Sequence, residues 1–399
     1  MLTCLTAGES HGPQLTAIMD GFPAGMCVDV ERINYHLARR QKGYGRGGRM
    51  KIEQDKVEVV SGIRGGFTMG GPITLVIHNK DWANWIDIMH PINPVGDDLP
   101  LKKKRLAFET TRPRPGHADL AGAVKYNHHD LRNVLERASA RETAARVALG
   151  ALARQLLEHF NVAFASHVVQ IGPVRLPDGY DLSNLAHIID LSENSEARCI
   201  DENTGQEMIA AIRLAKKARD SLGGVVEVIV RGLPIGLGSY SQWSRRMDAR
   251  LAAAMMAIQS VKGVEIGLGF TAGAKRGSEV HDEIFYSPDG EPAKKRFYRR
   301  TNNAGGIEGG ITNGEDIVIR VAGKPISTLN QPLKTVDVVT KEPAEAMVER
   351  TDNCVVPALA VICENVAALV LADAFLEKFG ADNLAEIERN YQAFLNAEY

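Results

Sequence analysis

The chain has 399 residues, of which 44% are hydrophobic and 24% charged, and its formal net charge at pH 7 is -2. This composition suits a globular protein with ample core, and the near-neutral charge gives no overall field that would favour nucleic acid. No uncharged run approaches the ~20 residues of a membrane span, and the amino terminus lacks the pattern of a signal peptide. We therefore expect a cytoplasmic protein.

The cysteines argue against a disulfide framework and against a zinc site. Their number is odd and no CxxC pair occurs, which favours a reducing compartment and predicts no metal centre. They are Cys4, Cys27, Cys199, Cys354 and Cys363.

Two stretches near the start combine glycine with reactive or basic residues. In "GESHG", glycines flank Ser10 and His11 and would allow a bulky or planar ligand to approach. In "RRQKGYGRGGRMK" (39–51), repeated glycines predict a loop that carries six basic residues and no acidic one. Guanidinium groups bind phosphate and carboxylate in a bidentate manner, so this loop predicts an anion site; a disordered basic loop is the alternative.

The stretch "TRPRPGHADL" (111–120) should be stiff. Pro113 and Pro115 fix their φ angles and favour extended conformations at the residues before them. Arg114 and His117 would then be presented in a fixed geometry, and His117 could act as a general acid toward a bound phosphate. A structural histidine is the alternative. The runs 102–105 and 294–300 are also basic, and solvated loops explain them equally well.

Three long segments predict helices, and four shorter ones predict strands. The helical segments are 131–160, 241–263 and 357–380, and all three are rich in alanine. The apolar residues of 131–160 spread over much of the helix circumference, which indicates burial. The strand segments are 70–79, 225–232, 264–270 and 315–323, bounded by glycine or alternating in polarity.

This order lacks the regular alternation of a doubly wound fold. We expect a single α+β domain over residues 1–399, with Ala-rich helices packed against antiparallel sheets. Two blocks, around 52–160 and around 224–263, share the plan of glycine-bounded strands followed by an Ala-rich helix. They indicate a possible internal duplication.

Charged residues mark the starts of two predicted helices. Arg137 and Arg141 in "ERASARET" stand one turn apart and should share a helix face, where they need a partner. In "ERTDNC" (349–354), Asp352 precedes the last helix, and a helix cap is the alternative there.

Two glycine-rich motifs are less specific. "GLGFTA" (267–272) fits a dinucleotide fingerprint, but a poor helix former follows it. "GGIEGGITNG" (305–314) favours turns.

Taken together, many arginines, two histidines, one acid and glycine-rich surfaces predict a site for an anionic substrate that undergoes proton transfer or elimination. A nucleic-acid-binding module that uses the basic loops and a nicotinamide-dependent dehydrogenase that uses 267–272 are the alternatives.

Several long blocks together resemble the chorismate synthase family from about residue 3 to about residue 380. They are "AGESHGPQLTAIMDGFPAG", "RRQKGYGRGGRM", "VEVVSGIRGGFTMGGPITLVIHNKD", "TRPRPGHADLAGAVKY", "RNVLERASARETAARVA", "NNAGGIEGGITNGEDI", "KPISTL" and "ERTDNCVVPA". The resemblance implies a β-α-β sandwich, a homotetramer, and a lyase of the shikimate pathway. The reaction implied is the anti 1,4-elimination of phosphate from 5-enolpyruvylshikimate 3-phosphate, giving chorismate, with reduced FMN and no net redox change.

The resemblance also implies a role for each matching position. His11 would protonate or steady the reduced flavin, His117 would protonate the departing phosphate, and Asp352 would act with flavin N5 in removing the substrate proton. Substrate contacts are implied for Ser10, Arg40, Arg46, Arg49, Arg114 and Arg141, with NADP also linked to Arg40 and Arg46. Flavin contacts, for FMN or FAD, are implied for Arg137, Ala138, Ser139, Gln259, Ser260, Gly309, Lys324, Pro325, Ile326, Ser327, Thr328 and Arg350.

Two departures from the family pattern qualify these roles. Many members read R-H-D-P before the last helix, whereas this chain reads Arg350-Thr351-Asp352-Asn353. The chain also shows no added flavin-reductase domain. It is expected to be monofunctional and to depend on an external flavin reductase, with NADPH as an indirect reductant.

Overall fold

A four-stranded antiparallel sheet forms one outer layer of the molecule. The computed structural model describes residues 2–47, 53–92, 108–349 and 351–398. The strand order is β1-β2-β6-β3. The strands are β1 (Thr3–Ala7), β2 (Gln14–Asp20), β6 (Ile73–His78) and β3 (Glu58–Ser61). Polarity alternates along β2, so that Leu15, Ala17 and Met19 are buried against the interior while the residues between them are less buried.

A five-stranded antiparallel sheet forms the opposite layer, in the order β10-β15-β9-β7-β8. The strands are β10 (Val261–Ile266), β15 (Ile317–Gly323), β9 (Gly224–Arg231), β7 (Ala163–Ile171) and β8 (Val174–Arg175). Val226, Val228 and Val230 of β9 are fully buried on its inner face. The strands predicted from the alternating segments 225–232 and 315–323 are therefore confirmed.

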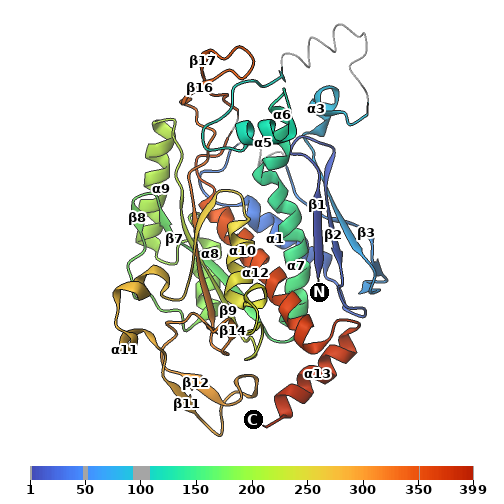
Figure 1. Cartoon of the computed structure of the whole chain (residues 1–399), viewed down its shortest axis with the longest axis vertical. Helices are drawn as coiled ribbons and strands as arrows, with labels where there is room; N and C mark the ends of the chain where they lie inside the picture. Colours follow the sequence, from blue (N-terminus) through green and yellow to red (C-terminus); the bar gives the residue numbers. More distant parts are fainter. Residues whose placement is uncertain (1, 48–52, 93–107, 350, 399) are drawn as a thin grey trace.

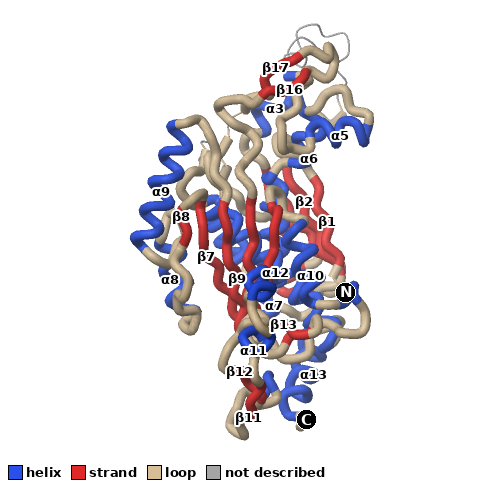
Figure 2. The backbone as a smooth tube through the Cα atoms, turned by 60° about the vertical axis from the view of Figure 1, so that its left-hand side comes forward, coloured by secondary structure: helices blue, strands red, loops and turns tan. Residues whose placement is uncertain are grey.

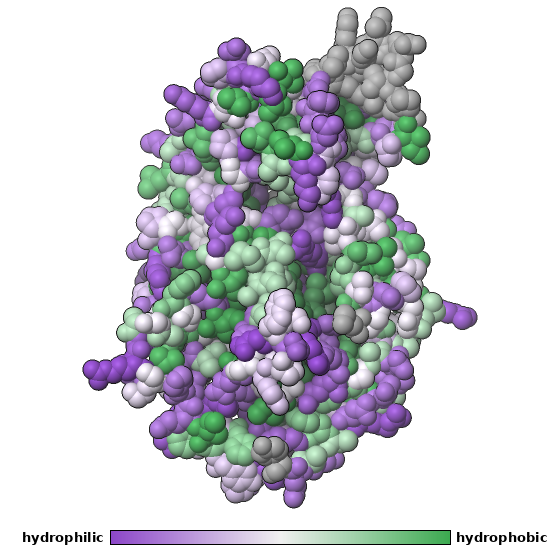
Figure 3. Space-filling model, in the orientation of Figure 1, coloured by the Kyte–Doolittle hydropathy of each residue, from purple (hydrophilic) through white to green (hydrophobic). Residues whose placement is uncertain are grey.

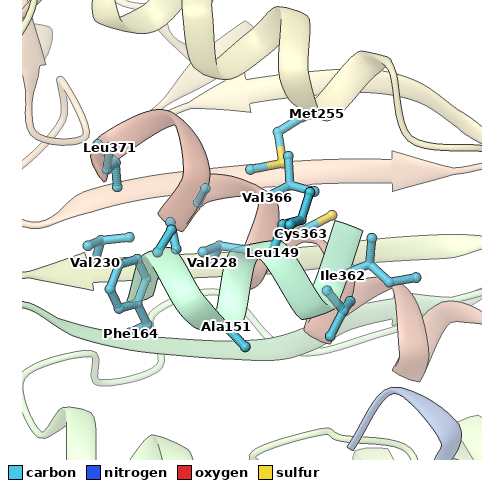
Figure 4. Close-up of a cluster of buried hydrophobic side chains, with 14 of the residues drawn as sticks. Leu149, Ala151, Phe164, Val228, Val230, Met255, Ile362, Cys363, Val366 and Leu371 are labelled. Atoms are coloured by element: carbon cyan, nitrogen blue, oxygen red, sulfur yellow. The ribbon is translucent and has the colours of Figure 1, made fainter. Parts of the chain in front are cut away.

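Helices lie between the two sheets. Figure 2 shows β7 and β9 on one side of α7 (Thr143–His159) and α12 (Val356–Phe379), and β1 and β2 on the other. Side chains of α7, α12 and β9 interdigitate in this middle layer (Figure 4). The predicted β-α-β sandwich of antiparallel sheets and Ala-rich helices is confirmed.

Small residues let the two central helices approach closely. A Cβ added at Gly150 of α7 would lie 2.3 Å from the backbone oxygen of Asn365 in α12. Both helices are apolar on most sides because each is enclosed by a sheet and by the other helix. In length and composition α12 could cross a membrane, but 83% of its most apolar stretch is buried within the protein, as expected for a core helix.

Of the remaining elements, α1 (Val30–Gln41) packs against α7 and α12, and α10 (Met247–Met256) packs against α12, so both belong to the middle layer, and the rest surround the sandwich (Figure 1). Within the described residues, the other α-helices besides α1 and α10 are α3 (Trp82–Met89), α5 (Asp119–Tyr126), α6 (Arg132–Ala138), α8 (Leu185–Asn194), α9 (Glu202–Lys217), α11 (Gly277–Val280) and α13 (Leu384–Asn396). The short strands pair as hairpins: β4 (Ile63–Arg64) with β5 (Phe67–Thr68), β11 (Ile284–Tyr286) with β12 (Phe297–Arg299), β13 (Ile307–Glu308) with β14 (Ile311–Thr312), and β16 (Lys334–Val336) with β17 (Pro343–Glu345).

Two helix predictions were wrong in extent. The segment 131–160 is broken at Ser139, whose extended backbone (ψ 141°) separates α6 from the short 3-10 helix η1 (Ala140–Glu142) that leads into α7. The segment 241–263 forms an α-helix only as α10, which the short 3-10 helix η2 (Trp243–Arg245) precedes, because the chain turns after Met256 to enter β10. Tertiary structure overrode helix propensity at both places. The last helix, predicted at 357–380, is confirmed as α12.

The two sheets differ in strand number and strand order. The possible duplication of residues 52–160 in 224–263 stays a prediction.

Candidate functional site

One large cavity, of about 810 Å³, opens at the end of the sandwich where α7 and α12 begin. Most of the motifs singled out in the sequence meet here. Hydrophilic and hydrophobic residues are interspersed over the face of the molecule in Figure 3. Within the described residues, the cations in the wall outnumber the carboxylates. The cations are Arg40, Arg46, Arg112, Arg114, Arg132, Arg141 and Lys324, and the carboxylates are Asp81, Glu109, Glu349 and Asp352.

The "GESHG" loop follows β1 and brings Ser10 and His11 to the cavity wall. Backbone N–H groups of both residues donate to Glu136 of α6: Ser10 to its backbone oxygen (3.0 Å) and His11 to its Oε2 (2.8 Å). The Ser139 hydroxyl lies 3.1 Å from that of Ser10. Because the helix breaks at Ser139, the Ser139 hydroxyl can contact Ser10 and so link the "GESHG" loop to the start of α7.

Arg40 and Arg141 share a buried carboxylate. Nη1 of Arg141 lies 2.6 Å from Oδ1 of Asp55, and Nη1 of Arg40 lies 3.3 Å from Oδ2 of the same group. Arg141 also donates to the side-chain oxygen of Asn79 (3.0 and 2.9 Å). Burial lowers the pKa of Arg40 to about 10, which still leaves the guanidinium charged at neutral pH. Both guanidinium groups are therefore fixed in the wall as cations.

The Pro-bounded stretch presents Arg114 and His117 together, as predicted. Arg114 Nε donates to Asp119 Oδ2 (2.8 Å) and its Nη1 donates to the Thr328 hydroxyl (2.8 Å). His117 Nδ1 lies 2.5 Å from Asp119 Oδ1 and 3.0 Å from Arg114 Nη2. Burial raises the pKa of Asp119, but bonds from His117 and Arg114 outweigh burial and hold that pKa well below its usual range. Asp119 is therefore an ionised group behind the wall.

The basic loop after α1 lies against the segment that precedes α12. Arg46 Nη1 lies 3.1 Å from Asp352 Oδ2, and the Gly47 N–H donates to Asp352 Oδ1. Gly43 and Gly45 have φ angles of 110° and 93°, and a Cβ at either would meet Pro357 or Cys354 at 3.0 Å or less. Close backbone contact thus explains these glycines. Asp352 does not cap α12, since the N-cap position is Val355, without a side-chain cap bond.

The opposite wall comes from the ends of β10 and β15. Gln259 Nε2 donates to Glu142 (2.9 Å), while its Oε1 is buried without a hydrogen-bond partner in the part of the chain that the structure describes. Ser260 has a φ of 74°, uncommon for a residue with a side chain, and its backbone oxygen accepts from the Lys324 N–H (2.9 Å). Burial, and then the nearby Lys262, lower the pKa of Lys324.

The structure brings most predicted site residues into this one wall. They are Ser10, His11, Arg40, Arg46, Arg114, His117, Ala138, Ser139, Arg141, Gln259, Ser260, Lys324, Pro325, Ile326, Ser327, Thr328 and Asp352. Arg49 and Arg350 lie outside the described residues.

Two predicted flavin contacts lie away from the wall. Arg137 points toward β1, where it donates to backbone oxygens of Gly8 (3.2 Å) and Thr6 (2.8 Å). The expectation that it shares a helix face with Arg141 was wrong, because the chain breaks between them at Ser139. Gly309 forms the tight turn of the β13–β14 hairpin. The turn interpretation of 305–314 is confirmed.

Two long helices direct their amino ends at the cavity. Thr143 begins α7, Val356 begins α12, and residues of both first turns line the wall. The amino end of a helix carries partial positive charge and unpaired N–H groups. The helices therefore add to the arginines in favouring an anionic ligand.

Some residues of the site were missed in the sequence. The indole of Trp85 stacks on the His11 ring, with ring centroids 4.0 Å apart. Asp55, Asn79 and Glu136 hold the arginines and His11 from behind. Of these four residues, only Glu136 stands in a motif that the sequence analysis treated as a candidate site, because it opens "ERASARET". Nothing local in the sequence marks Trp85, Asp55 or Asn79, since their site partners His11 and Arg141 are far from them along the chain.

Comparison with known proteins agrees with this arrangement. The sequence profile described as "Chorismate synthase" matches residues 2–376. The chain belongs to the chorismate synthase family. Chorismate synthases of Geobacter metallireducens and Geotalea uraniireducens are 55% and 53% identical to it, over 99% of both chains in each case. A solved structure described as "Crystal Structure of Chorismate Synthase" is 41% identical, covers 99% of this chain and 97% of its own, and superposes with a TM-score of 0.77.

Membership of the chorismate synthase family makes the chain an enzyme, a lyase of the shikimate pathway that serves aromatic amino-acid biosynthesis. The dinucleotide motif at 267–272 has no counterpart in the fold. After β10 the chain enters a 3-10 helix, η3 (Gly269–Ala274), where a dinucleotide site needs an α-helix.

Proposed function

We propose that the cavity catalyses the anti 1,4-elimination of phosphate from 5-enolpyruvylshikimate 3-phosphate, giving chorismate, with reduced FMN bound beside the substrate. The observation that carries the proposal is that His11, His117 and Asp352 meet in one 810 Å³ cavity whose wall holds more cations than carboxylates. Such a wall suits a substrate that bears a phosphate and carboxylates.

The wall also fits a flavin. The partnerless Oε1 of Gln259 can accept a hydrogen bond from a ring N–H, and Lys324 can bind a phosphate or an anionic ring. The chain from Lys324 to Thr328 offers backbone groups beside them. When bound, reduced FMN supplies electron density that eases cleavage of the substrate C–O bond.

Polar side chains of the wall carry out the proton transfers and stabilise the charge that develops in the reaction. His117, oriented by Asp119, protonates the departing phosphate, and Arg114 beside it balances the charge that develops there. Asp352, positioned by its ion pair with Arg46, accepts the proton that the substrate loses. His11 donates a proton toward the flavin, and apolar residues such as Leu359 and Ile362 exclude water from the reaction.

Binding of the substrate anions falls to Ser10, Arg40, Arg46, Arg49, Arg114 and Arg141. We also propose a cytoplasmic homotetramer that receives reduced FMN from an external flavin reductase. NADPH then acts as an indirect reductant, for which Arg40 and Arg46 are the candidate contacts.

One assay tests the proposed reaction. The protein is mixed with enolpyruvylshikimate phosphate and FMN under reducing, anaerobic conditions, and chorismate and phosphate are followed together. Both products should form in equal amounts. Folded protein that releases neither would contradict the proposal. Phosphate without chorismate would indicate simple hydrolysis instead.

A further inference from the structure

Both histidines of the cavity present the same ring nitrogen to a carboxylate. His11 Nδ1 lies 2.9 and 3.0 Å from the two carboxylate oxygens of Glu136, and His117 Nδ1 lies 2.5 Å from Asp119. The side chains of Glu136 and Asp119 are fully buried, and neither residue lines the cavity. The carboxylates thus act on the histidines from behind the wall.

Glu136 is held firmly in the ionised form. Arg132 donates to its Oε1 (3.1 Å), and the His11 N–H donates to its Oε2 (2.8 Å). Burial raises the pKa of Glu136, but the bonds and charge of His11 and then Arg132 outweigh burial and lower it. An ionised carboxylate has only acceptors, so Nδ1 of His11 must carry the proton of this contact. That leaves Nε2 available to the cavity.

The plane of the ring is fixed as well. Trp85 of α3 stacks on it at an interplanar angle of 25°, and its indole N–H donates to Asp81 Oδ2 (3.2 Å). The Arg132 guanidinium lies 5.2 Å from the Trp85 ring and also binds Glu349. Among the described residues, the charged groups that face His11 and this stack are therefore Glu136, Arg132, Glu349 and Asp81.

We propose that Glu136 is a positioning residue for His11: it fixes the tautomer with Nε2 toward the cavity and stabilises the protonated ring, while Trp85 sets the ring plane. The catalytic consequence rests on the proposed function, since only then does His11 serve as a proton donor. The geometry is that of a carboxylate behind a catalytic imidazole, which holds the ring in one tautomer and stabilises its cation.

Trp85 provides a reporter that needs no substrate. A protonated imidazole quenches the emission of an indole that it contacts, so Trp85 should brighten as His11 loses its proton. Trp82→Phe with Trp243→Phe leaves Trp85 as the one remaining tryptophan of the three. In that background the pH titration of emission reports on His11, and His11→Gln should abolish the transition.

Glu136→Gln keeps size and an acceptor but removes the charge. The midpoint of the emission transition should fall by about one to three pH units, the range typical of a lost neighbouring opposite charge. Glu388→Gln is the control: it removes the carboxylate partner of another histidine, His159, which lies away from the cavity, and it should leave the midpoint in place. Equal midpoints in the two variants would overturn the inference.

Kinetics separate this inference from the proposed function. Glu136→Gln should lower kcat by about 10- to 100-fold, the range found when a carboxylate behind a metal-binding histidine is lost, with KM for enolpyruvylshikimate phosphate little changed. A shifted midpoint with normal kcat would overturn the positioning role yet leave the proposed function intact. Absence of chorismate with the unaltered protein would contradict the proposed function, while the emission titration would still test the contact.

Discussion

Arg39 and Arg40 are neighbours at the end of α1, and they enter two different buried charge clusters. Arg39 makes a paired contact with Glu364 of α12 (2.9 and 3.0 Å), and Arg154 and the Ser166 hydroxyl bind the same carboxylate. Arg40 instead reaches the cavity wall, where it contacts Asp55. Both arginines are about 5% exposed or less.

The difference between the two clusters lies in what surrounds the charges. Around Glu364 each charge is enclosed by protein, and the cluster joins α1, α7, α12 and β7. Around Arg40 one side of the cluster is open volume, and Gln259 Oε1, which has no hydrogen-bond partner among the described residues, lines the same cavity. A buried cation therefore does not by itself indicate a site. The open volume beside it does.

Removing an acid or base from the cavity should have the largest effect on turnover. His117→Ala and Asp352→Ala are each expected to lower kcat by about 10²- to 10⁴-fold, because a positioned proton donor or acceptor is lost. FMN binding should persist, and denaturant midpoints should change little. Steady-state kinetics and FMN titration measure these effects.

His159→Ala is the matched control, since that histidine is half exposed and pairs with Glu388 far from the cavity. Near-normal turnover in His117→Ala or in Asp352→Ala would mean that its assigned catalytic role is wrong.

Removing the central charge of the enclosed cluster should affect stability instead. Glu364→Gln leaves two buried arginines short of a partner and should lower the free energy of unfolding by about 3–5 kcal/mol. Urea denaturation measures this, with the exposed Glu388→Gln as control. A stable variant with impaired turnover would place Glu364 in the catalytic machinery and remove the contrast between the clusters.

The effect of Glu364→Gln should depend on pH. Burial raises the pKa of Glu364, but Arg39 and Arg154 outweigh it and hold the pKa well below 4.5. A lowered folded-state pKa contributes stability in full above the unfolded value, and that contribution is lost as pH falls toward the folded value. The stability difference between the unaltered protein and the variant should therefore shrink below about pH 4.5. A difference that grew on acidification would contradict this assignment.

Gly150→Ala tests the middle layer alone. The new Cβ would meet the backbone of Asn365 at 2.3 Å, so the two central helices must move apart. Overpacking of this kind typically costs about 1–3 kcal/mol. Thermal or urea unfolding would detect it. Ala148→Gly removes a methyl group from another fully buried position of α7 and tests the reverse change. A Gly150→Ala variant as stable as the parent would show that α7 and α12 do not pack this closely.

Arg46→Ala should have the smallest effect. Loss of one anion contact is expected to raise KM for the phosphorylated substrate about tenfold, near 1.4 kcal/mol, while FMN affinity changes less. The exposed Arg175→Ala serves as control. The opposite ranking of the two ligands would mean that the loop serves the flavin.

Local patterns predicted the parts of the fold that local forces determine. Alternation along β9 and β15 and the apolar character of α12 follow from burial on one face or on all faces, so the sequence displays them. The break at Ser139 and the early end of α10 depend on contacts across the molecule, such as the bond between Ser139 and Ser10. The local pattern of apolar and polar residues cannot predict contacts between residues so far apart in the sequence.

The candidate site shows the same division. Arg40, Arg114 and His117 stand in unusual local sequences that draw attention to them, and all three reach the wall. Asp55 and Trp85 stand in ordinary sequence, and their importance comes from partners 86 and 74 positions away, Arg141 and His11. Arg137 had a conspicuous sequence, yet its side chain turns to β1 and does not line the cavity.

The most direct test of the account is a crystal structure of the chain with oxidised FMN and enolpyruvylshikimate phosphate. Both ligands should occupy the cavity between the amino ends of α7 and α12. The substrate phosphate should lie within hydrogen-bond reach of His117, and the flavin should lie beside Gln259 and Lys324. Either ligand bound at a separate surface, with the cavity filled only by water, would contradict the claim that these scattered residues form one active site.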